Sequence, residues 1–371
     1  MLAGLPEIQF CETAVDSIES AVITTYEAIT GRTLAQGDPV RLFLQSVAAI
    51  IVQQRVLIDY SAKQNLLAYS EGDFLDHIGA LTGVPRLDAS AAKTTLRFIL
   101  SVLQPQVVTI PAGTRATTEN NVVFATTSAV EIPIGGVTAD APAACLTVGA
   151  SGNGYVAGQV NKFVDPLPWV QSVSNITTSA GGADIESDDS LRERIHQSPE
   201  SFSTAGPDGA YEFWAKTAHQ LITDVAVYSP APGEVEIRPL LAGGEIPGAE
   251  ILEAVHAACN DRKIRPLTDH VAVLAPEIVP YDLSATYYIA RANATTSLAI
   301  QTAVSAAVAD YVTWQKSKIG RDINPTELMY RVRAAGAHRV VISSPAFAVV
   351  ERQQVAVARS VALTFGGLED G

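Results

Sequence analysis

Apolar residues recur at helical spacing through the first part of the chain, to about Pro85. Over Glu12–Thr30 they follow a period of three to four residues, and Gly31 is suited to end that helix. A shorter helix is predicted over Asp73–Leu81. The pattern therefore predicts an N-terminal region built of helices.

Between these two helices lies a longer one, whose first half is apolar on nearly all sides. Asp38 and Pro39 are typical of a helix start, with the aspartate as N-cap, and no further proline or glycine occurs before Tyr69. Such a helix needs neighbours on several sides. We expect a partner helix to contact Leu42, Phe43, Ile50, Ile51 and Leu57. The alternative is that these side chains are buried inside this chain alone.

The period changes to two from about Ala89 to Thr178, which is typical of β-strands. Short strands are predicted at 95–100, 107–110, 122–125 and 130–134, separated by glycine and asparagine turns. The pattern predicts an all-β module and is compatible with both a sandwich and an irregular barrel.

Helices and strands are mixed from Asp184 onward. Helices are predicted at 191–197, from Pro207, at 248–260, at 297–317 and at 325–335. Strands are predicted at 223–228, 234–239, 270–274, 283–289, 339–343 and 355–364. The fold class is therefore multidomain α+β, with a helical N-terminal segment, a middle all-β domain and a C-terminal α+β domain.

Composition narrows the class of protein. The chain has 371 residues and a formal net charge of −14, which argues against a nucleic-acid surface. Its three cysteines, Cys11, Cys145 and Cys259, lack the spacing of a disulfide framework or a zinc site. We expect no signal peptide, and the most apolar run, Val47–Val52, is too short for a membrane span.

No residue pattern points to catalysis, a cofactor or a metal. The six histidines are scattered, and the glycines from Gly149 to Gly158 match no phosphate-binding motif, so we interpret them as turns with positive φ. The acidic run Asp184–Asp189 could hold a cation, but carboxylates before a helix are also favoured by the helix dipole. We expect capping, with Ser190 and Glu193 as a capping box.

Ordered motifs carry a resemblance to a known family. They include Gly72-Asp73-Phe-Leu-Asp76, Thr109-Ile-Pro111-Ala-Gly113-Thr-Arg, the glycine-rich segment from Gly149, the acidic link from Gly181, and Arg265-Pro-Leu-Thr-Asp-His270-Val. In this order the chain resembles the baseplate J-like family, the wedge proteins of contractile phage tails, over about Asp38–Val273 and more loosely after Tyr281.

The resemblance implies a domain plan and a set of partners. The expected domains are a helical partner-bundle region at 1–87, a β-rich domain at 88–180 and an α+β domain at 181–371 that pairs between copies. The implied partners are a second copy of the chain, the smaller tail protein of the wedge, a lysozyme-like sheath initiator and the central hub or spike. The protein would be assembled in the bacterial host cytoplasm and end in the baseplate of a virion or tail particle.

Gly181 and Gly182, followed by polar residues, are a plausible flexible joint. Because a baseplate ring opens when the tail fires, we predict a hinge within 178–187. The function predicted is therefore a structural wedge protein that couples baseplate opening to sheath contraction, and not an enzyme. A tail-associated glycan-degrading enzyme and a β-rich adhesin are the alternatives.

Overall fold

The structure is a computed structural model that describes residues 5–202 and 207–370. Residues 203–206, directly before the predicted helix start at Pro207, lie outside these residues. Contacts divide the chain into two compact units, Met1–Arg86 with Ser187–Ser198 (unit 1) and Leu87–Glu186 with Pro199–Gly371 (unit 2). The predicted fold class is confirmed: helices come first, then a β domain, then an α+β region.

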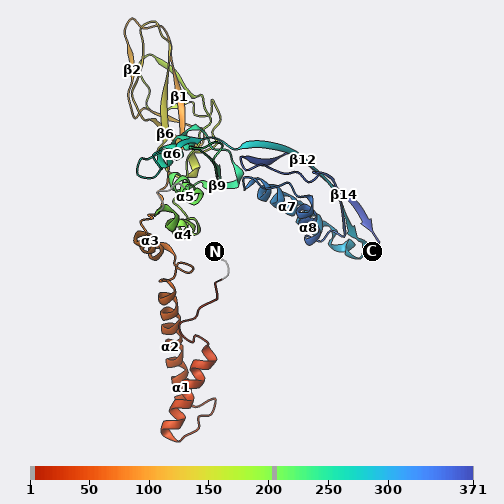
Figure 1. Cartoon of the computed structure of the whole chain (residues 1–371). Coiled ribbons are helices and arrows are strands. Elements are labelled where there is room, and N and C mark those ends of the chain that lie inside the picture. Colours follow the sequence, from red (N-terminus) through yellow and green to blue (C-terminus); the bar gives the residue numbers. More distant parts are fainter. Residues whose placement is uncertain (1–4, 203–206, 371) are drawn as a thin grey trace. The chain divides into compact units, whose positions relative to one another are not determined.

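Unit 1 consists of two pairs of packed helices. They are α1 (Val15–Thr30) against α2 (Pro39–Lys63), and α3 (Gly72–Leu81) against α4 (Asp188–Gln197) (Figure 1). The predicted start of α2 is confirmed, because the Asp38 side chain accepts a hydrogen bond from the Val40 N–H at 2.8 Å. The helix ends at Lys63, before Tyr69. The next residue, Gln64, is buried, and its side chain accepts a hydrogen bond from the Glu71 N–H.

The β domain of unit 2 is antiparallel. Its strands are β1 (Lys93–Leu100), β2 (Val108–Ile110), β3 (Arg115–Thr117), β4 (Val123–Thr126), β5 (Val130–Ile132), β6 (Thr138–Cys145), β7 (Lys162–Phe163) and β8 (Val170–Asn175). Six form a sheet in the order β7-β3-β4-β6-β1-β8, and β2 pairs with β5. The two end strands of the sheet lie next to each other. The sheet therefore curls into an irregular barrel around Leu96, Phe98 and Phe124.

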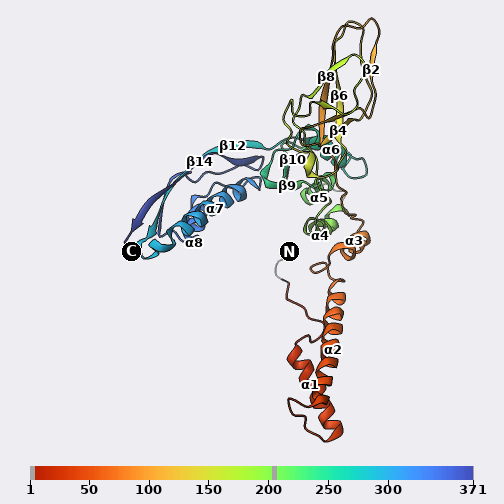
Figure 2. The same ribbon diagram turned by 180° about the vertical axis from the view of Figure 1, so that it is seen from behind.

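The α+β region of unit 2 contains two three-stranded sheets. The first joins β9 (Ile222–Tyr228), β10 (Glu234–Leu241) and β11 (His270–Val273), and packs on α5 (Asp208–Ala218) and α6 (Ala249–Cys259). The second joins β12 (Glu277–Ala290), β13 (Arg339–Ser344) and β14 (Gln354–Glu369), and α7 (Ser297–Lys316) and α8 (Pro325–Ala334) lie along it (Figure 2). Each sheet has its own buried cluster, so each helix pair covers one sheet.

Candidate functional site

The predicted partner-bundle residues occupy two different positions on α2. Leu42, Phe43, Ile50 and Leu57 are exposed within this chain. Ile51 instead lines a groove towards α1, together with Ile18 and Val22 of that helix. In all of α2 only Ala48 and Asp59 are classed as buried. Four of the five residues are thus available to another molecule, while Ile51 belongs to the α1–α2 contact.

The exposed residues of α2 have a regular spacing. Phe43, Ile50 and Leu57 recur every seven residues, and Leu42 and Val56, with Ala49 between them, form a neighbouring column. Repeats of seven place apolar side chains along one seam of a helix, which is the pattern of helices that pack side by side. This spacing favours another helix as the occupant of the face.

Length and composition alone would also allow α2 to cross a membrane, and only 6% of its most apolar window is buried. The opposite side of α2 forms hydrogen bonds with the N-terminal part of the chain, however. Gln45 donates to Glu19 of α1 at 2.6 Å, and Asp59 accepts the Phe10 N–H at 2.7 Å. A bilayer core would leave such polar groups and the acidic α1 without water, which is costly. We therefore interpret α2 as a protein-packing helix.

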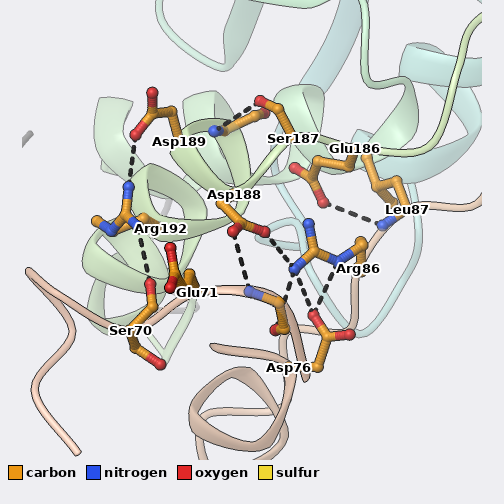
Figure 3. Close-up of polar contacts among 12 residues, drawn as sticks. Ser70, Glu71, Asp76, Arg86, Leu87, Glu186, Ser187, Asp188, Asp189 and Arg192 are labelled. Atoms are coloured by element: carbon orange, nitrogen blue, oxygen red, sulfur yellow. Dashed lines mark hydrogen bonds and ion pairs between the residues drawn. The ribbon is translucent and has the colours of Figure 1, made fainter. Parts of the chain in front are cut away.

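Arg86 joins the end of the N-terminal segment to the first turn of α4 (Figure 3). Its guanidinium lies 2.7 Å from Asp76 and 2.8 Å from Asp188, and Asp188 also accepts the Gly72 N–H at 2.9 Å. The Gly72 hydrogen bond, followed by Arg86, lowers the pKa of Asp188. One turn further along α4, Arg192 donates to the carbonyls of Leu67 and Ser70. Helix α4 is thus bound to segment 67–86 through charged hydrogen bonds.

The acidic run is used by the protein itself. Asp184 accepts the Ala150 N–H, Glu186 accepts the Leu87 N–H at 3.0 Å, and Asp189 pairs with Arg192. No cluster of three or more His, Cys, Asp or Glu side chains suited to a metal occurs in the part of the chain that the structure describes. The geometry therefore supports the structural interpretation of these carboxylates.

The capping-box prediction at Ser190 is wrong in position. Helix α4 begins at Asp188, and its N-cap is Ser187, whose side chain accepts the Ser190 N–H at 3.3 Å. With Asp188 and Asp189 in the first turn, two carboxylates lie at the positive end of the helix dipole. The helix therefore starts three residues before the predicted Leu191.

The predicted hinge glycines are hydrogen-bonded within unit 2. Gly181 has a φ of +82° and its carbonyl accepts the Ser90 hydroxyl at 2.8 Å. Gly182 exchanges two hydrogen bonds with the Asn153 side chain, at 2.8 and 2.7 Å. An added Cβ on Gly182 would lie 2.4 Å from the Gly149 carbonyl oxygen. A close backbone approach therefore accounts for this glycine, and Asn153 is an anchor that sequence reasoning missed.

Three of the four glycines before this link adopt the predicted turns; Gly152 differs, because it has no positive φ and lies in a short 3-10 helix, where an added Cβ would meet Cys145 at 2.9 Å. Gly149, Gly154 and Gly158 all have positive φ. The Asp184 carboxylate lies close to Gly149. A Cβ added to Gly149 would lie 2.5 Å from a carboxylate oxygen of Asp184. The glycines of this segment thus allow the backbone to turn and to pack closely at the end of the β domain.

Comparison with known proteins identifies four family domains in order. They are the baseplate J-like N-terminal domain at 36–93, the barrel domain at 95–182, the central domain at 203–275 and the C-terminal domain at 281–364. Together these matches leave only short segments of the chain outside the family, apart from its N-terminal 35 residues.

Individual relatives are phage or prophage proteins. Baseplate protein J of Escherichia phage P2 is 30% identical over 188 residues, 50% of this chain and 61% of that protein. The Mu-like prophage FluMu protein gp47 of Haemophilus influenzae is 27% identical over 184 residues, 49% of this chain and 50% of its own length. The chain thus spans about half to three fifths of the relatives it matches.

A solved baseplate of the anti-feeding prophage contains a chain with a TM-score of 0.43 and 11% identity, covering 93% of this chain and 90% of that chain. The four ordered domain matches and the phage P2 relative are sufficient: the chain belongs to the baseplate J-like family.

Proposed function

We propose that this protein is a structural wedge subunit of a contractile-tail baseplate. The ordered succession of the four baseplate J-like domains carries the proposal. The relative from phage P2 is itself called a baseplate protein, which supports a place in the baseplate of a virion or tail particle. In this role the chain works through its surfaces, together with a second copy, a smaller tail protein, a sheath initiator and the central hub.

The N-terminal helices are the proposed site for the smaller tail protein. The exposed face of α2, which we define by Leu42, Phe43, Ile50, Val56 and Leu57, offers apolar side chains in heptad columns. An apolar face of this kind is stabilised by packing against a second amphipathic helix. A bundle of α2 with a helix of the smaller tail protein would therefore bury the apolar face that is exposed in unit 1.

The hinge is proposed where the two compact units divide. The chain changes unit at Arg86/Leu87, at Glu186/Ser187 and at Ser198/Pro199. The second division lies within the predicted range 178–187, whereas Gly181 and Gly182 are bonded within unit 2. Rotation of one unit against the other would couple baseplate opening to sheath contraction with few backbone changes.

The enzymatic alternative has less support from the described side chains. A polar cavity in the β domain is lined by Thr118, Tyr155, Asn161 and neighbouring residues, and Glu119 is its single carboxylate. Glycoside hydrolysis generally uses a pair of carboxylates. The cavity therefore does not supply the groups that a glycan-degrading site needs.

The proposal is tested by the native mass of a tagged copy purified from cells that express its neighbouring genes. We expect a complex of two copies with one smaller tail protein. A monomer under these conditions, with the smaller protein expressed and soluble, would contradict the wedge assignment. A matched pair of variants on α2, Ile50→Gln and Ile51→Gln, tests the assignment of the bundle face.

A further inference from the structure

The polar cavity of the β domain lies between the turn that joins β3 to β4 and the loop that precedes β7. Its volume is about 310 Å³, and sites of about 300–1,000 Å³ are suited to small molecules. Its polar wall residues come from these two segments and are Thr118, Glu119, Asn120, Tyr155, Gln159 and Asn161. We call this site the β-domain cavity.

Hydrogen bonds fix both segments that form the β-domain cavity. In the turn, the Thr118 hydroxyl accepts the Val122 N–H at 3.2 Å. In the loop, the buried side chain of Asn175 accepts the Val160 N–H at 2.9 Å and donates to the Tyr155 carbonyl at 3.1 Å. A site whose walls are already held in place loses less conformational entropy when a ligand binds. The cavity is therefore preorganised.

Tyr155 offers the cavity a fixed aromatic ring and an unused hydroxyl. The ring packs against the β-domain core and lies edge-on to Phe124, with ring centroids 6.1 Å apart and an interplanar angle of 82°. The hydroxyl forms no hydrogen bond with any residue that the structure describes. A tyrosine held in this way combines an apolar surface with a group that can both donate and accept.

The amide side chains of the cavity retain both donors and acceptors. The Asn161 Nδ2 donates to the Gly158 carbonyl at 2.8 Å, which leaves the Asn161 side-chain oxygen as an acceptor. The Gln159 Oε1 accepts the Val156 N–H at 2.9 Å, which leaves the Gln159 NH₂ as a donor. The Asn120 amide has no partner among the described residues. Neutral donors and acceptors in one cavity suit hydroxyl groups, since a hydroxyl both donates and accepts.

The charges at the cavity favour an uncharged ligand. Of the described wall residues only Glu119 is charged, and the Lys162 ammonium lies 3.9 Å from its carboxylate. A phosphate or carboxylate ligand generally pairs with a basic group in the wall of its site, and none of the described wall residues is basic. A cationic ligand would have to compete with Lys162 for a single carboxylate. An uncharged molecule with several hydroxyls and an apolar ring face matches these walls, and this combination is found in a hexopyranose sugar.

We propose that the β-domain cavity binds an uncharged hexopyranose unit without cleaving it. The apolar face of the sugar lies against the Tyr155 ring, and its hydroxyls bind the Tyr155 hydroxyl and the amides of Asn120 and Asn161. Glycoside hydrolysis generally uses a pair of carboxylates, and Glu119 is a single one, so the bound sugar is held and not hydrolysed. The inference goes beyond the baseplate function, because it gives the β domain a ligand of its own.

Saturation-transfer NMR of the purified chain with D-glucose, D-galactose, N-acetyl-D-glucosamine and a tetrasaccharide of each tests the inference. We expect at least one of these sugars to bind with a Kd of about 0.1–10 mM. Tyr155→Phe and Asn120→Ala should each weaken that binding at least about fivefold, because each removes hydrogen bonds to the ligand. Tyr155→Phe keeps the ring that packs on Phe124, so its Tm should stay close to that of wild type. Tyr330→Phe is the matched control, since it removes the hydroxyl of an exposed tyrosine on α8 and should bind sugar like wild type.

The monosaccharide and tetrasaccharide arms distinguish the sources of the ligand. Binding of a monosaccharide supports recognition of a single unit, and binding of a tetrasaccharide alone supports recognition within a polysaccharide chain. If no sugar binds up to about 50 mM, or if the two cavity variants bind as tightly as wild type, the inference is wrong. It is also wrong if choline or inorganic phosphate binds the cavity and no sugar does. None of these results changes the native mass of the complex, so the baseplate proposal is tested separately.

Discussion

The Arg86 guanidinium lies 2.8 Å from the Asp188 carboxylate, so the last residue of the N-terminal segment is bound to the first turn of α4. Arg86 is largely buried, with 13% of its side chain exposed, and it also contacts Asp76. Both partners belong to unit 1, which is built from segments that are distant in sequence. The ion pair therefore helps to hold a discontinuous unit together.

Substituting Arg86 should loosen α4. We expect Arg86→Ala to lower the free energy of local opening of α3 and α4 by about 1–3 kcal/mol, because two carboxylates lose their charged donor. Hydrogen exchange of the α3 and α4 amides measures this change. Arg97→Ala is the control, since Arg97 and Asp140 form an exposed pair of the kind that contributes about 0–1 kcal/mol. If Arg97→Ala lowers the free energy of local opening around Arg97 as much as Arg86→Ala does in α3 and α4, the role given to Arg86 is contradicted.

The same contact should depend on pH. The Gly72 hydrogen bond and Arg86 lower the pKa of Asp188 below its ordinary value of 3.8. A carboxyl group with a lowered folded-state pKa stabilises the fold above its unfolded pKa, and this contribution is lost as pH falls through the folded value. Exchange of α4 in wild type and Asp188→Asn should therefore differ at pH 6, and the difference should shrink only as pH falls below 3.8 through the lowered folded-state pKa, where Asp188 becomes protonated. A difference that does not change at all between pH 6 and the acid limit of the folded protein would rule out this charge as its origin.

Gly182→Ala should destabilise the β domain whether or not a hinge operates nearby. Its added Cβ would meet the Gly149 carbonyl oxygen at 2.4 Å and the Asn153 side chain at 2.9 Å. We expect a cost of about 1–3 kcal/mol, seen as a lower Tm of unit 2. Gly37→Ala is the control, because nothing lies within 4 Å of its added Cβ. An unchanged Tm for Gly182→Ala would mean that the backbone there is free to move, and would favour a hinge at the glycines themselves.

Local sequence signals predicted many element starts but not their partners. Asp38 and Pro39 marked the start of α2, because capping uses groups that are adjacent in the chain. The capping box at Ser190 was wrong since Ser187 offers the same hydroxyl one turn earlier and precedes two acidic residues. Local patterns thus predict that a helix is present. They do not determine its first residue when several nearby residues can act as the N-cap.

Strand β6 shows where periodicity fails. It is rich in alanine and contains Pro142, yet it lies between β4 and β1 in the sheet. Alanine gives little contrast between faces, and proline is uncommon in a central strand, so the pattern did not predict it. Contacts such as Asn153 with Gly182, or Arg86 with Asp188, depend on the tertiary fold and leave no local signal.

Ile50 and Ile51 provide the sharpest test of the bundle face, because they are neighbours in sequence with different surroundings. Ile50 is 59% exposed, whereas Ile51 lines the groove towards Ile18 of α1. Ile50→Gln should leave stability within about 0.5 kcal/mol, as for most surface changes, and weaken co-purification of the smaller tail protein. Ile51→Gln should destabilise the α1–α2 pair by about 1–2 kcal/mol, since it removes apolar contacts within the chain.

Stability is measured by hydrogen exchange of α1 and α2 in the isolated protein, and association by the amount of smaller tail protein recovered with a tagged copy. The two readouts must separate for the assignment to hold. If Ile50→Gln retains the partner in full, the exposed columns of α2 do not form the bundle interface. If it instead destabilises the isolated chain as much as Ile51→Gln does, Ile50 is buried within this chain and the alternative of intrachain burial is correct.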